Sequence, residues 1–339
     1  MKKCRTALWV ALAAGLTAHA ELIHHYPFDA DTSDAGARGV DLVPGPAGSI
    51  SNVCFREGGG SLFLQSNLAT EARPEAAPAG VPSEGNETNG WDGAASFENV
   101  VISPDTRTIA TWFRATPGES GDNTAAFVNL GVTGRDGARF TLRLDPDPLD
   151  GSLRILRCEI QGSYARIPSA TMDARIPGLT SLDDGVWHHV AVVVPNADAV
   201  IDDLVLYIDG VGFAGDAGSG GDLEIGTPGV AIDTGEGPIM VGDANNGDDR
   251  DFNGYIDDVR IYDEALSGTD IANLIAATGS PSTLCEFTAA PLASIAGQSV
   301  TLEWWIDPEH DTATVDQGVG DVSGATGSNG HGSLVVRPV

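Results

Sequence analysis

The sequence predicts an all-β protein, because three features of the chain favour short antiparallel strands over helices. Its 339 residues include 43 glycines and 19 prolines, which break helices and populate turns. Several segments alternate apolar and polar residues with a period of two, as half-buried strands do. In another segment, 204–208, one face carries Leu204, Leu206 and Ile208 and the other carries Val205 and Tyr207. Asp209-Gly210 follows it, a dipeptide typical of the tight turn of a β-hairpin.

The first twenty residues, "MKKCRTALWVALAAGLTAHA", have the pattern of a secretory signal peptide. Three basic residues precede an apolar stretch that is too short to span a bilayer, and the small-residue pattern Ala-His-Ala follows it. We expect cleavage before Glu21 and a secreted or cell-surface protein. No second apolar segment approaches membrane-spanning length, so the sequence predicts no membrane span after signal cleavage.

The charge of the chain excludes some classes of partner. The formal net charge is −30, and loss of the three basic residues of the signal changes it to −33 (−30 − 3). A balance this acidic disfavours nucleic acid and anionic membranes, whereas it favours solubility and divalent cations.

The segments that follow the signal are predicted in order from their composition. Residues 66–92 are rich in Ala, Pro, Glu and Gly, which predicts a surface insertion with little to bury. The run "GVWHHVAVVV" predicts a strand, in which His188 and His189 point to opposite faces and cannot easily share one metal. We expect Trp187 to fill the space between the sheets, one histidine to face the edge of the core and the other to be exposed.

The last element of this region is predicted to be a short helix. It follows the strand "GYIDDVRIY", and Ser267 with Asp270 forms a capping pair at its start. Ile271, Leu274 and Ile275 then fall on one helical face.

An ordered set of these segments resembles the laminin G-like family of the concanavalin A-like superfamily, in its bacterial secreted form. The resemblance rests on "LIHHYPFDADTSDAGARG", "GGGSLFL", "TIATWFRA", "DGVWHHVAVV" with "LYIDG", and "GYIDDVRIYDEALS". It covers residues 21–278 and implies a two-sheet antiparallel jelly-roll sandwich. Residues 181–187 also nearly match the Asp-box turn of sialidase propellers, but that motif is one residue short and has no second copy at a fixed period.

Residues 279–339 form a different, shorter region. The strand "AGQSVTLEW" resembles the immunoglobulin-like modules of bacterial surface proteins. A segment of this length can bury little core, and the last strands of such a module are missing, so we expect a partial module.

The sequence offers no evident catalytic residues. The laminarinase-type enzymes that share the jelly roll use an E-x-D-x-x-E pattern, which the chain lacks. Glu159 is the lone acid on an expected central strand, and we interpret it as a solvent-facing residue. A nucleophile elbow, a phosphate-cradling glycine loop and paired Cys-x-x-Cys motifs are also missing from the sequence.

Calcium is the cofactor that the resemblance implies, as a structural ion. The site would join Asp29 or Asp31 to Asp257 of the closing strand, with a carbonyl near Gly58. In the alternative, Asp257 and Asp258 merely flank Arg260 on a solvated strand.

Three cysteines remain after signal cleavage, which allows one disulfide at most. The pair that we predict is Cys54 with Cys158. The alternative is three thiols, with Cys285 the residue most easily left free.

The function predicted from the sequence is that of a secreted, non-catalytic recognition module for a glycan or an extracellular protein. Trp91, Phe97 and Phe252 are the candidate ligand-binding residues, because sugars stack on exposed aromatic rings. The alternatives are a structural or adhesive spacer and a glycan hydrolase.

Overall fold

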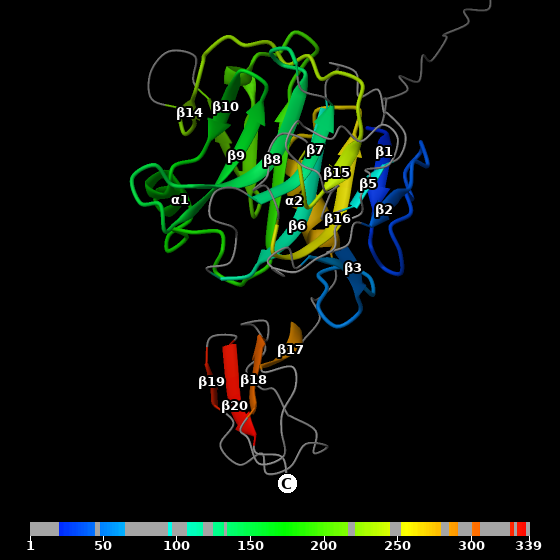
Figure 1. The fold of residues 1–339 in the computed structure, drawn as a ribbon. Helices are drawn as coiled ribbons and strands as arrows, with labels where there is room; N and C mark the ends of the chain where they lie inside the picture. The colour runs from blue at the N-terminus through cyan, green and yellow to red at the C-terminus, as the bar shows by residue number, and fades with distance from the viewer. Residues whose placement is uncertain are drawn as a thin grey trace, which may run out of the picture.

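The fold is described from a computed structural model, which covers residues 20–44, 48–64, 94–96, 107–117, 125–131, 134–215, 221–244, 252–278, 285–290, 300–305, 326–328 and 331–336. Within these residues the chain forms two eight-stranded antiparallel sheets and a separate four-stranded sheet (Figure 1). The predicted all-β, two-sheet fold is therefore confirmed. The predicted surface insertion, and the predicted signal peptide except for Ala20, lie outside the described residues.

The first sheet, sheet A, is built around the longest strands of the protein. Its order is β13 (Val211–Ala214), β12 (Val205–Ile208), β11 (His188–Val194), β6 (Arg107–Ala115), β16 (Gly254–Tyr262), β4 (Ser61–Leu64) and β3 (Gly48–Ser51), and β1 (Leu22–Tyr26) also pairs with β16. The register between β6 and β11 is continuous, from His188 opposite Phe113 to Val194 opposite Arg107. The strand predicted from "HHVAVVV" is thus a central strand of this sheet.

The second sheet, sheet B, faces the viewer in Figure 1, where β7, β8 and β9 run side by side. Its order is β14 (Glu224–Ile225), β10 (Ser163–Arg166), β9 (Arg154–Ile160), β8 (Arg139–Pro146), β7 (Ala125–Gly131), β15 (Ile239–Val241), β5 (Ala94–Ser96) and β2 (Leu42–Pro44). A short helix, α1 (Ser169–Arg175), follows β10, and one 3-10 turn spans Ile201–Asp203.

Apolar side chains from the inner faces of the two sheets form one core. Phe113 of β6 stacks on Phe127 of β7, with ring centroids 4.3 Å apart, and Phe252 meets Phe127 edge to face at 5.5 Å. All three rings are fully buried. Burial of such rings, at 150–250 Å² each, is a large stabilising contribution to a core.

The local signals that predicted the hairpin and the helix are confirmed. Asp209 and Gly210 both have positive φ angles, 49° and 82°, as the turn between β12 and β13 requires. Helix α2 (Gly268–Ala277) begins where Ser267 accepts a hydrogen bond from the backbone N–H of Asp270, and the Asp270 carboxylate accepts one from Ser267. Ile271 of α2 packs on the outer face of sheet A.

Three predictions about Trp187 and the first two residues of β11, His188 and His189, have mixed outcomes. His188 lies opposite Phe113 and His189 opposite Trp112, so the two rings point to opposite faces as predicted. Neither ring is exposed, however, because each residue is at most 5% accessible. Trp187 does not fill the space between the sheets: it packs with Trp112 and Tyr255 on the outer face of sheet A. Sequence alternation separates two faces but does not say which one meets the other sheet.

The C-terminal region contributes a sheet of its own. Its order is β17 (Cys285–Ala290), β18 (Val300–Trp305), β20 (His331–Val336) and β19 (Thr326–Ser328), all antiparallel. The immunoglobulin-like identity of this region stays a prediction. Among the described residues, no helix has the length and apolar character that crossing a membrane demands.

Candidate ligand-binding face

The outer face of sheet A is largely covered by other parts of the chain. Ile271 of α2 contacts Ala110 and Ala191, and Trp187 joins a cluster with Trp112. The guanidinium of Arg56, from the loop before β4, lies 4.2 Å above the Trp112 ring. This face is therefore occupied by packing within the described residues.

The outer face of sheet B has a different chemistry, which follows from alternation along its strands. On β8, Phe140, Leu142 and Leu144 enter the core, so the residues between them point outward. Cross-strand pairing then places Arg143 opposite Arg157. We call this surface the arginine face, and its residues are Arg139, Arg143, Asp145, Arg157, Glu159, Tyr164, Arg166 and Glu224.

Two carboxylates join the arginines of this face into one network. Glu159 binds Arg139, and its Oε2 lies 2.6 Å from Arg143 Nη2 and 2.7 Å from Arg157 Nη2. Asp145 bridges the same two arginines, at 3.1 Å from Arg143 and 2.7 Å from Arg157. Burial of Arg143, opposed by Glu159, lowers its guanidinium pKa to about 10.

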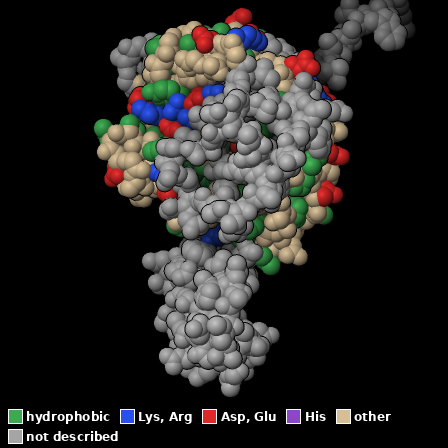
Figure 2. Space-filling view, viewed as in Figure 1, with side chains coloured by type: hydrophobic (Ala, Val, Ile, Leu, Met, Phe, Trp, Pro, Cys, Tyr) green, Lys and Arg blue, Asp and Glu red, His purple; other side chains and the backbone are tan. Residues whose placement is uncertain are grey.

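The edge of the arginine face at β10 and β14 is more accessible. Tyr164 is partly exposed, and the guanidinium carbons of Arg157 and Arg166 lie 4.1 and 4.9 Å from its ring centroid. Arg166 pairs with Glu224, whose side chain is 42% exposed. Figure 2 shows positive and negative side chains intermingled on the surface over β9 and β10.

The interpretation of Glu159 as a solvent-facing residue is wrong. Glu159 is only 8% accessible and contacts three arginines. Sequence reasoning also missed the arginine face as a whole. Its signal is the even spacing of the charged residues that share this face, in "RFTLRLD" (139–145) and in "RCE" (157–159), on two consecutive strands.

Of the residues predicted to hold calcium, Asp29, Gly58 and Asp257 lie at or contact one loop, and Asp31 does not. Asp257 is fully buried, and its Oδ2 accepts hydrogen bonds from the backbone N–H groups of Arg56 (2.7 Å) and Glu57 (2.9 Å). Asp29 Oδ1 accepts one from Gly59 at 2.5 Å, next to Gly58 in the same loop. Asp31 instead binds Ser33 and is exposed.

One observation at this loop fits a cation. Asp257 Oδ1 is buried and has no hydrogen-bond partner among the described residues, which leaves a carboxylate oxygen to be satisfied. Side chains alone do not complete a site there, because the described part of the chain contains no cluster of three His, Cys, Asp or Glu suited to a metal. Backbone carbonyls such as that of Gly58 would have to supply the remaining oxygen ligands.

The predicted disulfide between Cys54 and Cys158 is wrong. Cys158 is a free thiol, fully buried in the core between the sheets. Cys54 is disulfide-bonded, but it belongs to the cluster on the outer face of sheet A. Sheet A therefore separates the two sulfur atoms. Burial raises the pKa of the Cys158 thiol far above its ordinary value.

The aromatic residues predicted to bind a ligand do not form a site in the described structure. Phe252 is fully buried against Phe113 and Phe127, so that prediction is wrong. Trp91 and Phe97 lie outside the described residues. Tyr164 is the aromatic side chain that the arginine face contains.

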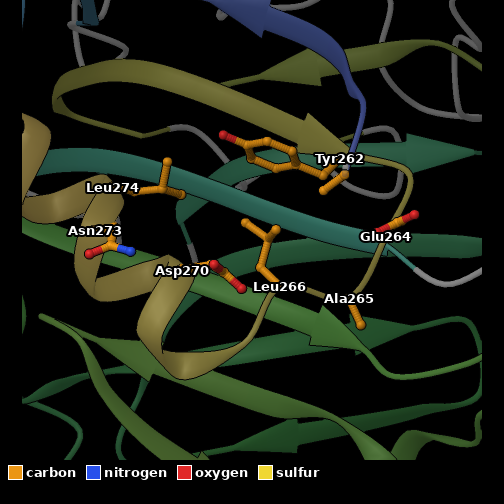
Figure 3. Close-up of a pocket in the computed structure, with 8 residues that line it drawn as sticks. Tyr262, Glu264, Ala265, Leu266, Asp270, Asn273 and Leu274 are labelled. Atoms are coloured by element: carbon orange, nitrogen blue, oxygen red, sulfur yellow. The ribbon is translucent and has the colours of Figure 1, made fainter. Parts of the chain in front are cut away.

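A pocket of about 380 Å³ opens beside α2. Figure 3 shows that the end of β16, the loop after it and the first turns of α2 line it, with Tyr262, Leu266 and Leu274 among the lining residues. Asp270 also lines it, but this carboxylate already caps the helix. Glu264 and Asn273 are its other polar lining residues.

Comparison with known families is consistent with this architecture. Residues 88–272 match the family model described as the concanavalin A-like lectin/glucanases superfamily. Comparison with curated proteins returned no match.

Several solved structures are similar at low sequence identity. One is domain 4 of AbnA, a GH43 extracellular arabinanase from Geobacillus stearothermophilus, in complex with arabinotriose: TM-score 0.48, 18% identity, covering 76% of this chain and 98% of that chain. The binding domain of Paraclostridial Mosquitocidal Protein 1 has a TM-score of 0.45 and 14% identity, over 84% of this chain and 64% of that chain. The CBM40 of Ruminococcus gnavus IT-sialidase has a TM-score of 0.34 and 14% identity, over 52% and 85%.

Proposed function

Because the chain belongs to the concanavalin A-like lectin/glucanase superfamily, we propose that it is a secreted or cell-surface, non-catalytic module that binds carbohydrate on the arginine face. The observation that carries this proposal is the contrast between the two outer faces. Helix α2 and aromatic packing cover sheet A, whereas polar side chains line sheet B and are partly accessible at its edge, at Tyr164, Arg166 and Glu224.

The side chains of the arginine face have the chemistry that sugar recognition needs. Tyr164 supplies a partly exposed ring, and guanidinium groups supply several N–H donors in fixed directions. Thr141 and Asn129 continue the polar face on β8 and β7, where the Thr141 hydroxyl donates to Asn129 Oδ1 at 2.7 Å. A few convergent polar groups beside an aromatic ring are typical of small-ligand sites.

The proposal of a non-catalytic role rests on how the acids of this face are used. A glycosidase needs one carboxyl group to protonate the leaving oxygen and a second to act as a base or nucleophile. Asp145 and Glu159 each bind at least two guanidinium groups instead. We propose that both acids orient arginines and take no part in bond cleavage.

We also propose a structural calcium ion at the loop before β4. Asp257 and Asp29 would hold it together with the carbonyl of Gly58, and the ion would tie the opening segment to the closing strand. The buried, unpartnered Asp257 Oδ1 supports this proposal. The ion would stabilise the fold, and the arginine face would bind the ligand.

A glycan array tests the proposed function. We expect the full chain to bind a subset of polysaccharides, and Tyr164→Ala to reduce that binding at least tenfold. Tyr207→Ala is the matched control, because Tyr207 packs beside α2 on sheet A. Equal binding by wild type and Tyr164→Ala would place the ligand elsewhere, and no binding to any glycan would favour a spacer role.

A further inference from the structure

We propose that the arginine face selects acidic glycans, in which sugar carboxylates pair with its guanidinium groups. This inference rests on the proposed function, since it names the class of carbohydrate that the same face binds. It starts from the charge of the face, which is opposite in sign to that of the protein.

The arginine face has an excess of positive charge. Its four arginines outnumber its three acids, Asp145, Glu159 and Glu224, by one. The whole chain has a formal net charge of −30. The arginine face is therefore a locally positive area, by one charge, on a strongly acidic protein, and this local field favours an anion there over the acidic remainder of the chain.

All of this positive charge comes from arginine. Lys2 and Lys3 are the only lysines of the sequence, so every later basic side chain other than histidine is a guanidinium. A guanidinium is planar and presents paired N–H donors that match the two oxygens of a carboxylate. Within the face, single guanidinium nitrogens contact Asp145 and Glu159, and each of these carboxylates is shared between Arg143 and Arg157.

Donors on three of these arginines are left over after the internal pairs are made. Nε and Nη1 of Arg143 are buried, and the described residues give them no hydrogen-bond acceptor. The Nε atoms of Arg157 and Arg166 are also buried and have no hydrogen-bond acceptor among the described residues. A buried donor without an acceptor is destabilising, most of all when it belongs to a charged group. An anionic ligand would supply the missing acceptors if the side chains that cover these donors move aside on binding.

The pair at the accessible edge shows how a ligand can compete. Arg166 is held by Glu224, whose side chain is 42% exposed, whereas the Arg166 side chain is 13% exposed. A sugar carboxylate can replace Glu224 as the partner of Arg166, or bind beside it. Removing the Glu224 charge should therefore strengthen the binding of an acidic glycan, and removing Arg166 should weaken it.

The test is calorimetric titration of the full chain with oligogalacturonate and with the same oligomer fully methyl-esterified. The ester has the same sugar backbone without the charge. We expect binding of the acid only, at least tenfold weaker for Arg166→Ala and several-fold tighter for Glu224→Gln. The ion pair of Arg175 with Asp222 provides matched controls, because Arg175→Ala and Asp222→Asn change the same charges away from this face.

The outcomes separate the inference from the proposed function. Equal binding of acid and ester, or binding of neutral glycans alone, overturns acid selection while leaving carbohydrate recognition intact. If Arg175→Ala weakens the binding of the acid as much as Arg166→Ala does, the effect is one of net charge and the assignment to this face is wrong. Absence of binding to both oligomers and to a neutral panel contradicts both proposals.

Discussion

Protonation of His188 should make the stability of the protein fall as the pH rises above neutral. His188 is 5% accessible and sits between two carboxylates. Its Nδ1 lies 2.8 Å from Asp209 and its Nε2 3.2 Å from Asp184. A neutral imidazole can donate from one nitrogen only, whereas the imidazolium donates from both. The charged ring is therefore the form that satisfies both partners.

The magnitude follows from the pKa of this histidine. Burial alone would lower it, but the hydrogen bonds to Asp184 and Asp209 raise the pKa of His188 from 6.5 to about 10. A base whose pKa is raised on folding stabilises fully below the unfolded value, and this stabilisation is lost as the pH passes from 6.5 to 10. At about 1.4 kcal/mol per pKa unit, the ceiling is on the order of 5 kcal/mol. Both carboxylates are partly exposed, so water screening should reduce the loss to roughly half of that.

Urea unfolding followed by tryptophan fluorescence at pH 6 to 10 measures this loss. We expect the free energy of unfolding of the wild type to fall across this range, and His188→Gln to be less stable at pH 6 with a much flatter dependence. His189→Gln is the control, because burial lowers the pKa of His189 to about 4 and the ring is neutral throughout the range. Parallel curves for wild type and His188→Gln would show that His188 does not carry this proton in the folded state.

Three further predictions concern stability and thiol chemistry. If calcium binds the folded state at the Asp257 loop, a 100-fold excess over its dissociation constant should add about 2.7 kcal/mol of stability. Chelation should lower Tm, and Asp257→Ala should abolish this response whereas the control Asp150→Ala should not. Identical melting curves with and without chelator would contradict the proposed calcium site. Gly58→Ala should lower the free energy of unfolding in urea by roughly 1–3 kcal/mol, because φ at Gly58 is +64° and the new Cβ would lie 1.8 Å from Asp29 Oδ1. A variant as stable as the wild type would show that this loop does not constrain residue 58. Alkylation followed by mass spectrometry should modify Cys158 only after unfolding, since its thiol is buried; rapid labelling of the native protein would contradict the core position.

The fold could be predicted because its signals are local. Asp209-Gly210 fixes a hairpin through backbone conformation alone, and Ser267 with Asp270 fixes the start of α2 through two hydrogen bonds. Each of these motifs needs only a few neighbouring residues. The position of Trp187 depended instead on which face of sheet A meets sheet B, a property of the assembled sandwich.

The candidate site could not be predicted in the same way. Arg143 and Arg157 are opposite each other only because β8 and β9 pair in one particular register. The resemblance to a known family directed attention to calcium ligands, and the stacking of sugars on aromatic rings directed it to Phe252, which belongs to the core. Glu159 shows the same limit, since a lone acid on a strand gives no sign of the three arginines around it.

The central claim is that a glycan binds on the outer face of sheet B, and hydrogen–deuterium exchange of the full chain with and without saturating oligogalacturonate tests it most directly. We expect slower exchange in peptides from β9 and β10 (Arg154–Ile160 and Ser163–Arg166), with no change in α2 or β12. Protection confined to α2 and the end of β16 would place the ligand in the pocket there. That result, or unchanged exchange over sheet B at saturation, would contradict the claim.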